Sequence, residues 1–207
     1  MGSQTCLYFL KDGGYRVRGT VRSMGNATKM DPIKKAFGEL FSQLDVVEAD
    51  LLDAESVANA ITGSEYVVHT ASPYILANIT DEENQLMKPA VEGTNNVLLG
   101  CTAAGTVKRL VVTSSVAAIG YPLKKDYPAD STFDESWWTD LNAEGLHPYR
   151  KCKTVAEKSA WDYVAKLPED KKFELTVINP GFIMGPSIAC GDALSEGFAI
   201  GIVTGKT

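Results

Sequence analysis

The chain has 207 residues, of which 44% are hydrophobic and 22% charged, a composition typical of a folded globular protein. Its formal net charge of −6 argues against general binding to nucleic acid or to anionic lipid, because both need a basic face. No apolar run approaches the roughly 18 residues of a membrane helix, and the first residues do not resemble a secretion signal. We therefore expect a cytoplasmic protein that does not associate with membranes; the sequence leaves its oligomeric state open.

Cysteines and histidines are too few and too scattered to predict a metal site. The four cysteines, Cys6, Cys101, Cys152 and Cys190, lack the paired spacing of zinc ligands, and the chain has two histidines. Isolated cysteines of this kind are typical of reduced thiols in a cytosolic protein.

Short runs rich in β-branched residues alternate with longer helical segments, which predicts a parallel sheet covered by helices on both faces. In chain order, the predicted strands are Arg16–Val21, Leu44–Ala49, Tyr66–Thr70, Leu110–Ser114 and Leu175–Ile178. The predicted helices between them are Lys29–Gln43, Ala54–Thr62, Asp81–Ala104 and Pro148–Lys166. We predict a single α/β domain that spans residues 1–207.

Local signals set several of the expected helix ends. Asp53 is placed to cap the second predicted helix, and Pro148 suits the first turn of the last one. Pro89 lies inside the third pattern, so we expect that helix to start or kink there. Gly13 and Gly14 are suited to end a short N-terminal helix in the left-handed conformation.

Tyr149 and Lys153 lie four residues apart in the last predicted helix, and therefore on one helix face. Such a pair serves hydride transfer: the phenol gives a proton to a carbonyl oxygen, and the nearby ammonium lowers the pKa of the phenol. The spacing alone is a weak signal, because Tyr121 and Lys125 repeat it in loop-like sequence. Ser114 and Ser115 end the strand before this helix, at the sheet edge where ligands of open α/β sheets collect, and a serine hydroxyl there is suited to hold the substrate oxygen.

Three motifs resemble the extended short-chain dehydrogenases/reductases, also known as the NAD-dependent epimerase/dehydratase family. They are TSSVA from Thr113, YRKCKTVAEK from Tyr149 and NPGFIMGP from Asn179, and they follow the family's order. The most similar branch is that of dihydroflavonol reductase and cinnamoyl-CoA reductase. The resemblance implies a Rossmann-like doubly wound parallel sheet and the NADP-dependent reduction of a ketone or aldehyde to an alcohol. Further segments that agree begin at Val17, Glu48, Val68 and Lys88.

The resemblance also implies roles for single residues. Ser115 matches the serine that orients the carbonyl, with Ser114 as the less favoured neighbour. Tyr149 matches the general acid, and Lys153 matches the residue that binds the nicotinamide ribose and tunes the tyrosine. The other implied cofactor-binding residues are Arg22 and Lys29 at the 2′-phosphate, Asp50 and Leu51 at the adenine, Thr70 and Ala71 near the nicotinamide, and Pro180 at the carboxamide.

Several of these residues also have a structural interpretation. The serines suit the cap of a strand end, and Arg22 fits a solvated series with Arg16 and Arg18. Asp50 fits a turn or a helix cap. His69, inside a predicted strand, is interpreted as a core histidine and not as a catalytic one. Arg22 favours NADP over NAD, for which an acidic side chain at this strand end is typical.

Other functions stay open at this point. The same serine, tyrosine and lysine serve nucleotide-sugar epimerases/dehydratases and hydroxysteroid dehydrogenases of the family. A non-catalytic remnant that acts as an interaction domain is a third possibility. A hydrolase is disfavoured, because the serines lack a GxSxG turn and neither histidine has a recognisable acidic partner.

The sequence departs from the family pattern at both ends. The family's first strand, its glycine-rich turn and most of its C-terminal substrate-binding part are not found in it. We therefore expect an incomplete fold in which the strands on either side of the first strand have free edges. Because backbone amides at a helix N-terminus supply much of the stabilisation of the cofactor's pyrophosphate, we also expect impaired reduction.

We predict that the chain as given binds NADPH poorly or not at all. Isothermal titration of the purified chain with NADPH should give no heat of binding at micromolar concentrations. Low-micromolar binding would refute this expectation.

Overall fold

The structure, a computed structural model, describes residues 1–121, 131–185, 188 and 201–205. The chain divides into two compact units: Met1–Asp50 with Phe182–Thr207, and Leu51–Gly181. Lys125 and Cys190, discussed above, lie outside the described residues. Cys6, Cys101 and Cys152 are free thiols.

The first unit is built on two parallel strands, β1 (Val17–Val21) and β2 (Leu44–Glu48), paired from Val17 with Leu44 to Val21 with Glu48. Helix α1 (Gly2–Asp12) precedes β1; α2 (Ala27–Phe37) and a 3-10 helix (Gly38–Gln43) connect the strands. The chain leaves α1 through Gly13, whose φ of 75° is the left-handed conformation predicted for it. The core is formed by Leu10, Val17 and Phe37, one from each of α1, β1 and α2.

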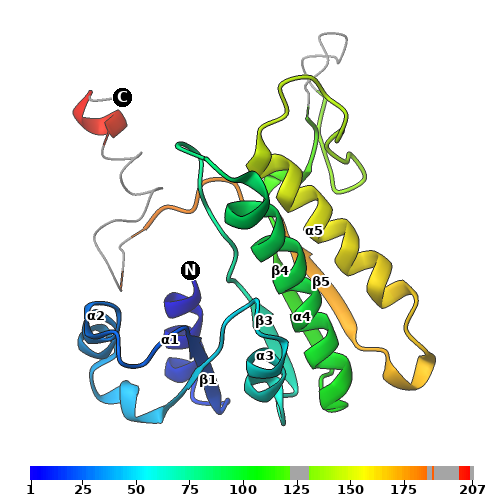
Figure 1. Cartoon of the computed structure of the whole chain (residues 1–207). Coiled ribbons are helices and arrows are strands. Elements are labelled where there is room, and N and C mark those ends of the chain that lie inside the picture. Colours follow the sequence, from blue (N-terminus) through cyan, green and yellow to red (C-terminus); the bar gives the residue numbers. More distant parts are fainter. Residues whose placement is uncertain (122–130, 186–187, 189–200, 206–207) are drawn as a thin grey trace. The chain divides into compact units, whose positions relative to one another are not determined.

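The second unit is built on three parallel strands in the order β3 (Tyr66–His69), β4 (Arg109–Thr113) and β5 (Glu174–Ile178). Three helices pack beside one another: α3 (Ala54–Ile61) on α4 (Lys88–Ala104), and α4 on α5 (Pro148–Ala165). In Figure 1, α4 and α5 run across the same face of these strands. Between helices and sheet lies the larger core, with Leu98, Leu110 and Ala160 fully buried in it.

The predicted elements are confirmed, with every strand end within one residue and every helix end within two of its expected place. Asp53 caps α3 by accepting hydrogen bonds from the amides of Glu55 and Ser56. Pro89 lies in the first turn of α4, directly after a π-helical turn at Glu83–Met87, so the 81–104 pattern is two helical segments. The predicted helix 29–43 likewise changes to 3-10 geometry at Gly38, whose φ is 55°.

The expectation of one sheet needs correction. In the described residues, β1 pairs with β2 and β3 pairs with β4, and no hydrogen-bonded ladder joins the two sheets. In the part of the second unit that the structure describes, α3, α4 and α5 pack in one layer, and no helix is seen on the other face of the sheet.

Candidate active site

The last helix of the second unit begins at the candidate general acid. His147 caps α5: its Nδ1 accepts the backbone N–H of Tyr149 at 3.1 Å, and Pro148 fills the first helical position, which has no N–H to satisfy. The other ring nitrogen, Nε2, lies 3.1 Å from the carbonyl oxygen of Leu76. Because Nδ1 accepts, Nε2 carries the proton and donates to Leu76. One neutral imidazole thus joins the start of α5 to the segment after β3.

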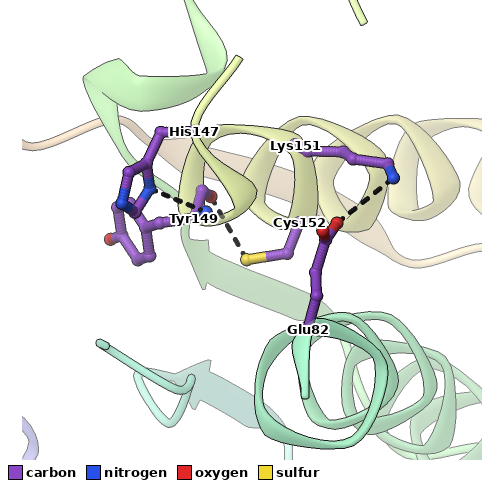
Figure 2. A network of polar contacts seen from close by, with 5 residues as sticks. All are labelled: Glu82, His147, Tyr149, Lys151 and Cys152. Atoms are coloured by element: carbon purple, nitrogen blue, oxygen red, sulfur yellow. Dashed lines mark hydrogen bonds and ion pairs between the residues drawn. The ribbon is translucent and has the colours of Figure 1, made fainter. Parts of the chain in front are cut away.

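Further contacts fix the first turn of α5 on the same segment (Figure 2). Lys151 forms an ion pair with Glu82 at 3.2 Å, and within α5 the thiol of Cys152 donates to the carbonyl oxygen of Tyr149 at 3.2 Å. The ring of Tyr74 meets the ring of Tyr149 edge to face, with centroids 5.2 Å apart. The phenol of Tyr149 is therefore held by its backbone and by its ring.

One turn further along α5, the side chain of Lys153 is buried, with 6% of its surface exposed. Its Nζ donates to the carbonyl oxygen of Thr113, the last residue of β4, at 2.9 Å. Burial lowers the pKa of Lys153, and the neighbouring Cys152 and Glu157 oppose that change. The ammonium thus connects α5 to the carboxyl end of the central strand.

Ser115 lies near Tyr149. Its Oγ accepts the amide of Ala117 at 3.1 Å, and its side chain lowers the pKa of the Tyr149 phenol by hydrogen bonding. The neighbouring Ser114 differs: its Oγ is buried and has no hydrogen-bond partner in the part of the chain that the structure describes. The geometry therefore favours Ser115 over Ser114, as the sequence suggested.

The pKa of the Tyr149 phenol differs from expectation. Burial, the largest influence, raises its pKa, while the hydrogen bond with Ser115 acts in the opposite direction. Lys153, which we expected to lower this pKa, is not among the groups that act on it; its Nζ is engaged by Thr113. In this state the phenol is protonated at neutral pH, which suits a proton donor.

His69 is confirmed as a buried histidine at the end of β3, with 7% of its surface exposed. It lines a small cavity together with Ser114 and Lys153. Burial, and secondarily the positive charge of Lys153, lowers the pKa of His69 to about 4. The imidazole of His69 is thus neutral at physiological pH. The positive charge at this cavity is the ammonium of Lys153.

Comparison with known proteins identifies this arrangement. Residues 17–187 match the model of the 3-beta hydroxysteroid dehydrogenase/isomerase family. The chain belongs to this family. It falls within the extended short-chain dehydrogenases/reductases, in the dihydroflavonol reductase and cinnamoyl-CoA reductase-like branch.

Relatives of this branch are plant and fungal reductases. The chain is 35% identical over 196 residues to tetraketide alpha-pyrone reductase 1 of Arabidopsis thaliana, and the match covers 94% of this chain and 58% of that protein. It is 35% identical over 175 residues to cinnamoyl-CoA reductase CAD2 of Medicago truncatula, covering 84% and 52%. The structure resembles yeast methylglyoxal/isovaleraldehyde reductase in complex with NADPH, with a TM-score of 0.76, 30% identity and coverage of 89% and 56%. The chain therefore spans little more than half the length of these relatives.

Four of the family's cofactor-binding positions lie in the same unit as Tyr149. Thr70 and Ala71 follow the carboxyl end of β3, and Pro180 follows β5, where its carbonyl accepts the amide of Val116 at 3.1 Å. Leu51 also has a structural role, because its carbonyl accepts the side-chain amide of Asn96 at 2.7 Å. The structure thus brings Thr70, Ala71 and Pro180 to the strand ends that carry Ser115.

The other three positions belong to the first unit. Arg22 follows the carboxyl end of β1 and is exposed, and Lys29 lies in the first turn of α2, which Asn26 caps. Asp50 is exposed just after β2. Arg18 differs from Arg22, because it forms an ion pair with Asp45 on the neighbouring strand at 2.8 Å. Arg16, Arg18 and Arg22, which form one series in the sequence, therefore do not share the same contacts.

Sequence reasoning missed the residues that hold the site. The proline after His147 indicates the start of a helix. Histidine, however, is an unusual helix cap, so no sequence motif predicts the side-chain contacts of His147. Tyr74 lies in a segment without regular structure. Within the described residues, no helix is long and apolar enough to cross a membrane, and no cluster of three or more candidate metal ligands is present.

We predict that His69 makes the stability of the fold depend on pH. The folded protein binds a proton at His69 less tightly than the unfolded chain does, where histidine titrates near 6.5, so stability is lost as the pH falls from about 6.5 towards about 4. The loss from this residue is of order 3 kcal/mol. Urea unfolding at pH 7 and pH 4 should show a smaller change in the free energy of unfolding for His69→Asn than for the wild type. Equal changes in the two proteins would contradict the assignment.

Proposed function

We propose that this protein is an NADP-dependent reductase that converts a ketone or aldehyde to an alcohol. The observation that carries the proposal is the placement of Tyr149 and Lys153 one turn apart on α5, with the buried ammonium of Lys153 bound to the carbonyl of Thr113, two residues before Ser115. The names of its relatives support the reaction class, because they describe reductases of small carbonyl compounds, and a related structure contains NADPH.

The residues of the second unit fit the reacting end of such a cofactor. NADPH, when bound, supplies the hydride that forms the new C–H bond at the carbonyl carbon. Ser115 donates a hydrogen bond to the carbonyl oxygen and orients it towards Tyr149. Tyr149 gives its phenol proton to that oxygen, which forms the alcohol O–H bond and leaves a phenolate. Lys153, whose Nζ is held by the carbonyl of Thr113, would bind the nicotinamide ribose, the role that its position in the motif implies.

Arg22 supports NADP over NAD. Unlike Arg18, whose guanidinium is paired with Asp45, Arg22 lies beyond the strand ladder, exposed and near the start of α2. An exposed guanidinium at this place can bind a 2′-phosphate by two parallel hydrogen bonds. Lys29, in the first turn of α2, adds a second cation for the same phosphate.

Oxidation of a hydroxysteroid is the second candidate, because the matched family model carries that name. Oxidation needs Tyr149 as a phenolate that accepts the alcohol proton. The raised pKa of Tyr149 favours the protonated phenol, and so favours reduction in the unliganded protein. Two further alternatives are the epimerisation or dehydration of a nucleotide sugar and a non-catalytic interaction domain. Both predict that the extended protein shows no carbonyl reduction.

Tyr149→Phe tests the general acid. The variant keeps the ring that packs on Tyr74 but loses the proton donor, so kcat for carbonyl reduction should fall by about 10²- to 10⁴-fold while NADPH binding is retained. The assay follows NADPH oxidation with small aldehydes and ketones, in the protein extended at its N-terminus by the family's first strand and glycine-rich turn.

Tyr163→Phe is the matched control for this experiment. It removes a phenol from the same helix, where the hydroxyl contacts Thr102 at 2.9 Å and not Ser115. Its turnover should equal that of the wild type. If Tyr149→Phe retains full turnover, Tyr149 is not the acid.

Arg22→Asp tests the cofactor preference. Replacing the cation by an acidic side chain removes the partner of the 2′-phosphate and provides one for the ribose hydroxyl of NADH. The ratio of the dissociation constants for NADPH and NADH should therefore shift towards NADH by at least about tenfold, as measured by fluorescence titration of the extended protein. Arg16→Asp, also outside the strand ladder, is the control. An unchanged ratio in Arg22→Asp would show that Arg22 is a solvated charge.

A further inference from the structure

We propose that Asn179 and Glu157 are positioning residues that hold the backbone of Ser115 in place for the reaction. This inference rests on the proposed reductase function. It is carried by one side-chain amide that connects the end of β5, the middle of α5 and the loop after β4.

Asn179 follows β5 directly and uses both hydrogens of its amide. Nδ2 donates to Oε2 of Glu157 at 2.7 Å and to the backbone carbonyl of Ser115 at 3.2 Å. An amide nitrogen has two hydrogens to donate, so these two contacts employ its full capacity. The same carbonyl also accepts the amide of Ala118 at 2.9 Å.

The carboxyl group of Glu157 fixes the orientation of the Asn179 side-chain amide. Its side chain is buried, with 3% of its surface exposed, on α5 one turn after Lys153. The oxygen Oε2 accepts from Nδ2 of Asn179, so the NH₂ group faces Glu157 and the flipped amide would place two oxygens against each other. The second hydrogen is then directed to Ser115. A buried polar group is costly unless it is hydrogen-bonded, which favours this contact with Asn179.

The backbone on either side of Ser115 is also attached to the end of β5. The amide of Ser114 donates to the carbonyl of Ile178 at 2.8 Å, and the amide of Val116 donates to that of Pro180 at 3.1 Å. The carbonyl of Ser115 lies between these two attachments, and Asn179 supplies its link to β5. This link fixes the peptide plane that follows Ser115, and with it the direction of the Ser115 hydroxyl towards Tyr149.

Catalysis is sensitive to the position of the Ser115 hydroxyl. A displacement of about 1 Å in a group that orients the substrate can lower the rate up to about 10²-fold. Loss of the Asn179 link should therefore lower kcat, while the affinity for the carbonyl substrate changes little, because neither Asn179 nor Glu157 is expected to touch the substrate.

The test separates positioning from simple packing by exchanging the two groups. Asn179→Asp places two carboxylates against each other and is expected to destabilise the fold. Adding Glu157→Gln restores the contact between α5 and β5 with reversed polarity, because the introduced glutamine amide donates to the introduced carboxylate. The aspartate in that double variant has no proton to donate to the carbonyl of Ser115.

We expect the double variant Glu157→Gln/Asn179→Asp to recover the melting temperature lost in Asn179→Asp. In the N-terminally extended protein, its kcat for carbonyl reduction by NADPH should stay about tenfold below that of the extended wild type, with KM changed less than about twofold. Hydrogen exchange of the backbone amides at 114–118, followed by mass spectrometry, should remain roughly tenfold faster than in the wild type. Recovery of kcat and of slow exchange together with the melting temperature would overturn the proposal.

Asp162→Asn is the matched control, since it replaces an exposed carboxylate on the same helix by an amide. It should change neither kcat nor exchange at 114–118. If the N-terminally extended protein shows no carbonyl reduction, the proposed function fails, and the exchange rates still decide whether Asn179 holds this segment. Wild-type exchange in the double variant would then refute the positioning role by itself.

Discussion

The buried ammonium of Lys153 on the carbonyl of Thr113 is the contact on which the site depends. A charge with 6% of its surface exposed is tolerated because a polar group receives it, and here that group is the carboxyl end of the central strand. The contact fixes the rotation of α5 about its axis. Since residues four apart share one helix face, the same rotation brings Tyr149 to the segment that carries Ser115.

Burial sets the protonation states around this ammonium. It keeps His69 neutral, lowers the pKa of Lys153 and raises the pKa of Tyr149. Each change disfavours the charged form of a group out of water. The site at rest therefore has a protonated phenol that can donate, and a lysine whose charge is supported by the nearby carboxylate of Glu157. Such a resting state suits reduction of a carbonyl better than oxidation of an alcohol.

The strands and helices could be predicted from the sequence because periodicity and local caps determine them, as Asp53 at α3 and Gly13 after α1 illustrate. The spacing of Tyr149 and Lys153 places both on one face of α5, and the family resemblance added Ser115; their catalytic roles stay predictions. Contacts between segments far apart in the chain could not be predicted from the sequence. Asn179 binds Ser115 across 64 positions, and His147 binds Leu76 across 71, and no local pattern encodes either contact. The lowered pKa expected for Tyr149 was wrong for the same reason, since it depends on where the Lys153 ammonium is held.

The chemistry and the cofactor preference depend on different parts of the chain. Ser115, Tyr149 and Lys153, together with the residues that hold them, belong to the unit Leu51–Gly181, whereas Arg22 and Lys29 belong to the other unit. Hydrogen bonds within the second unit act over about 3 Å and control where the proton donor faces. An exposed arginine acts on an anion by charge, which solvent and salt weaken. On the proposed function, the choice between NADP and NAD would therefore rest on an exposed charge of the first unit, whereas the direction of the proton donor rests on hydrogen bonds inside the second unit.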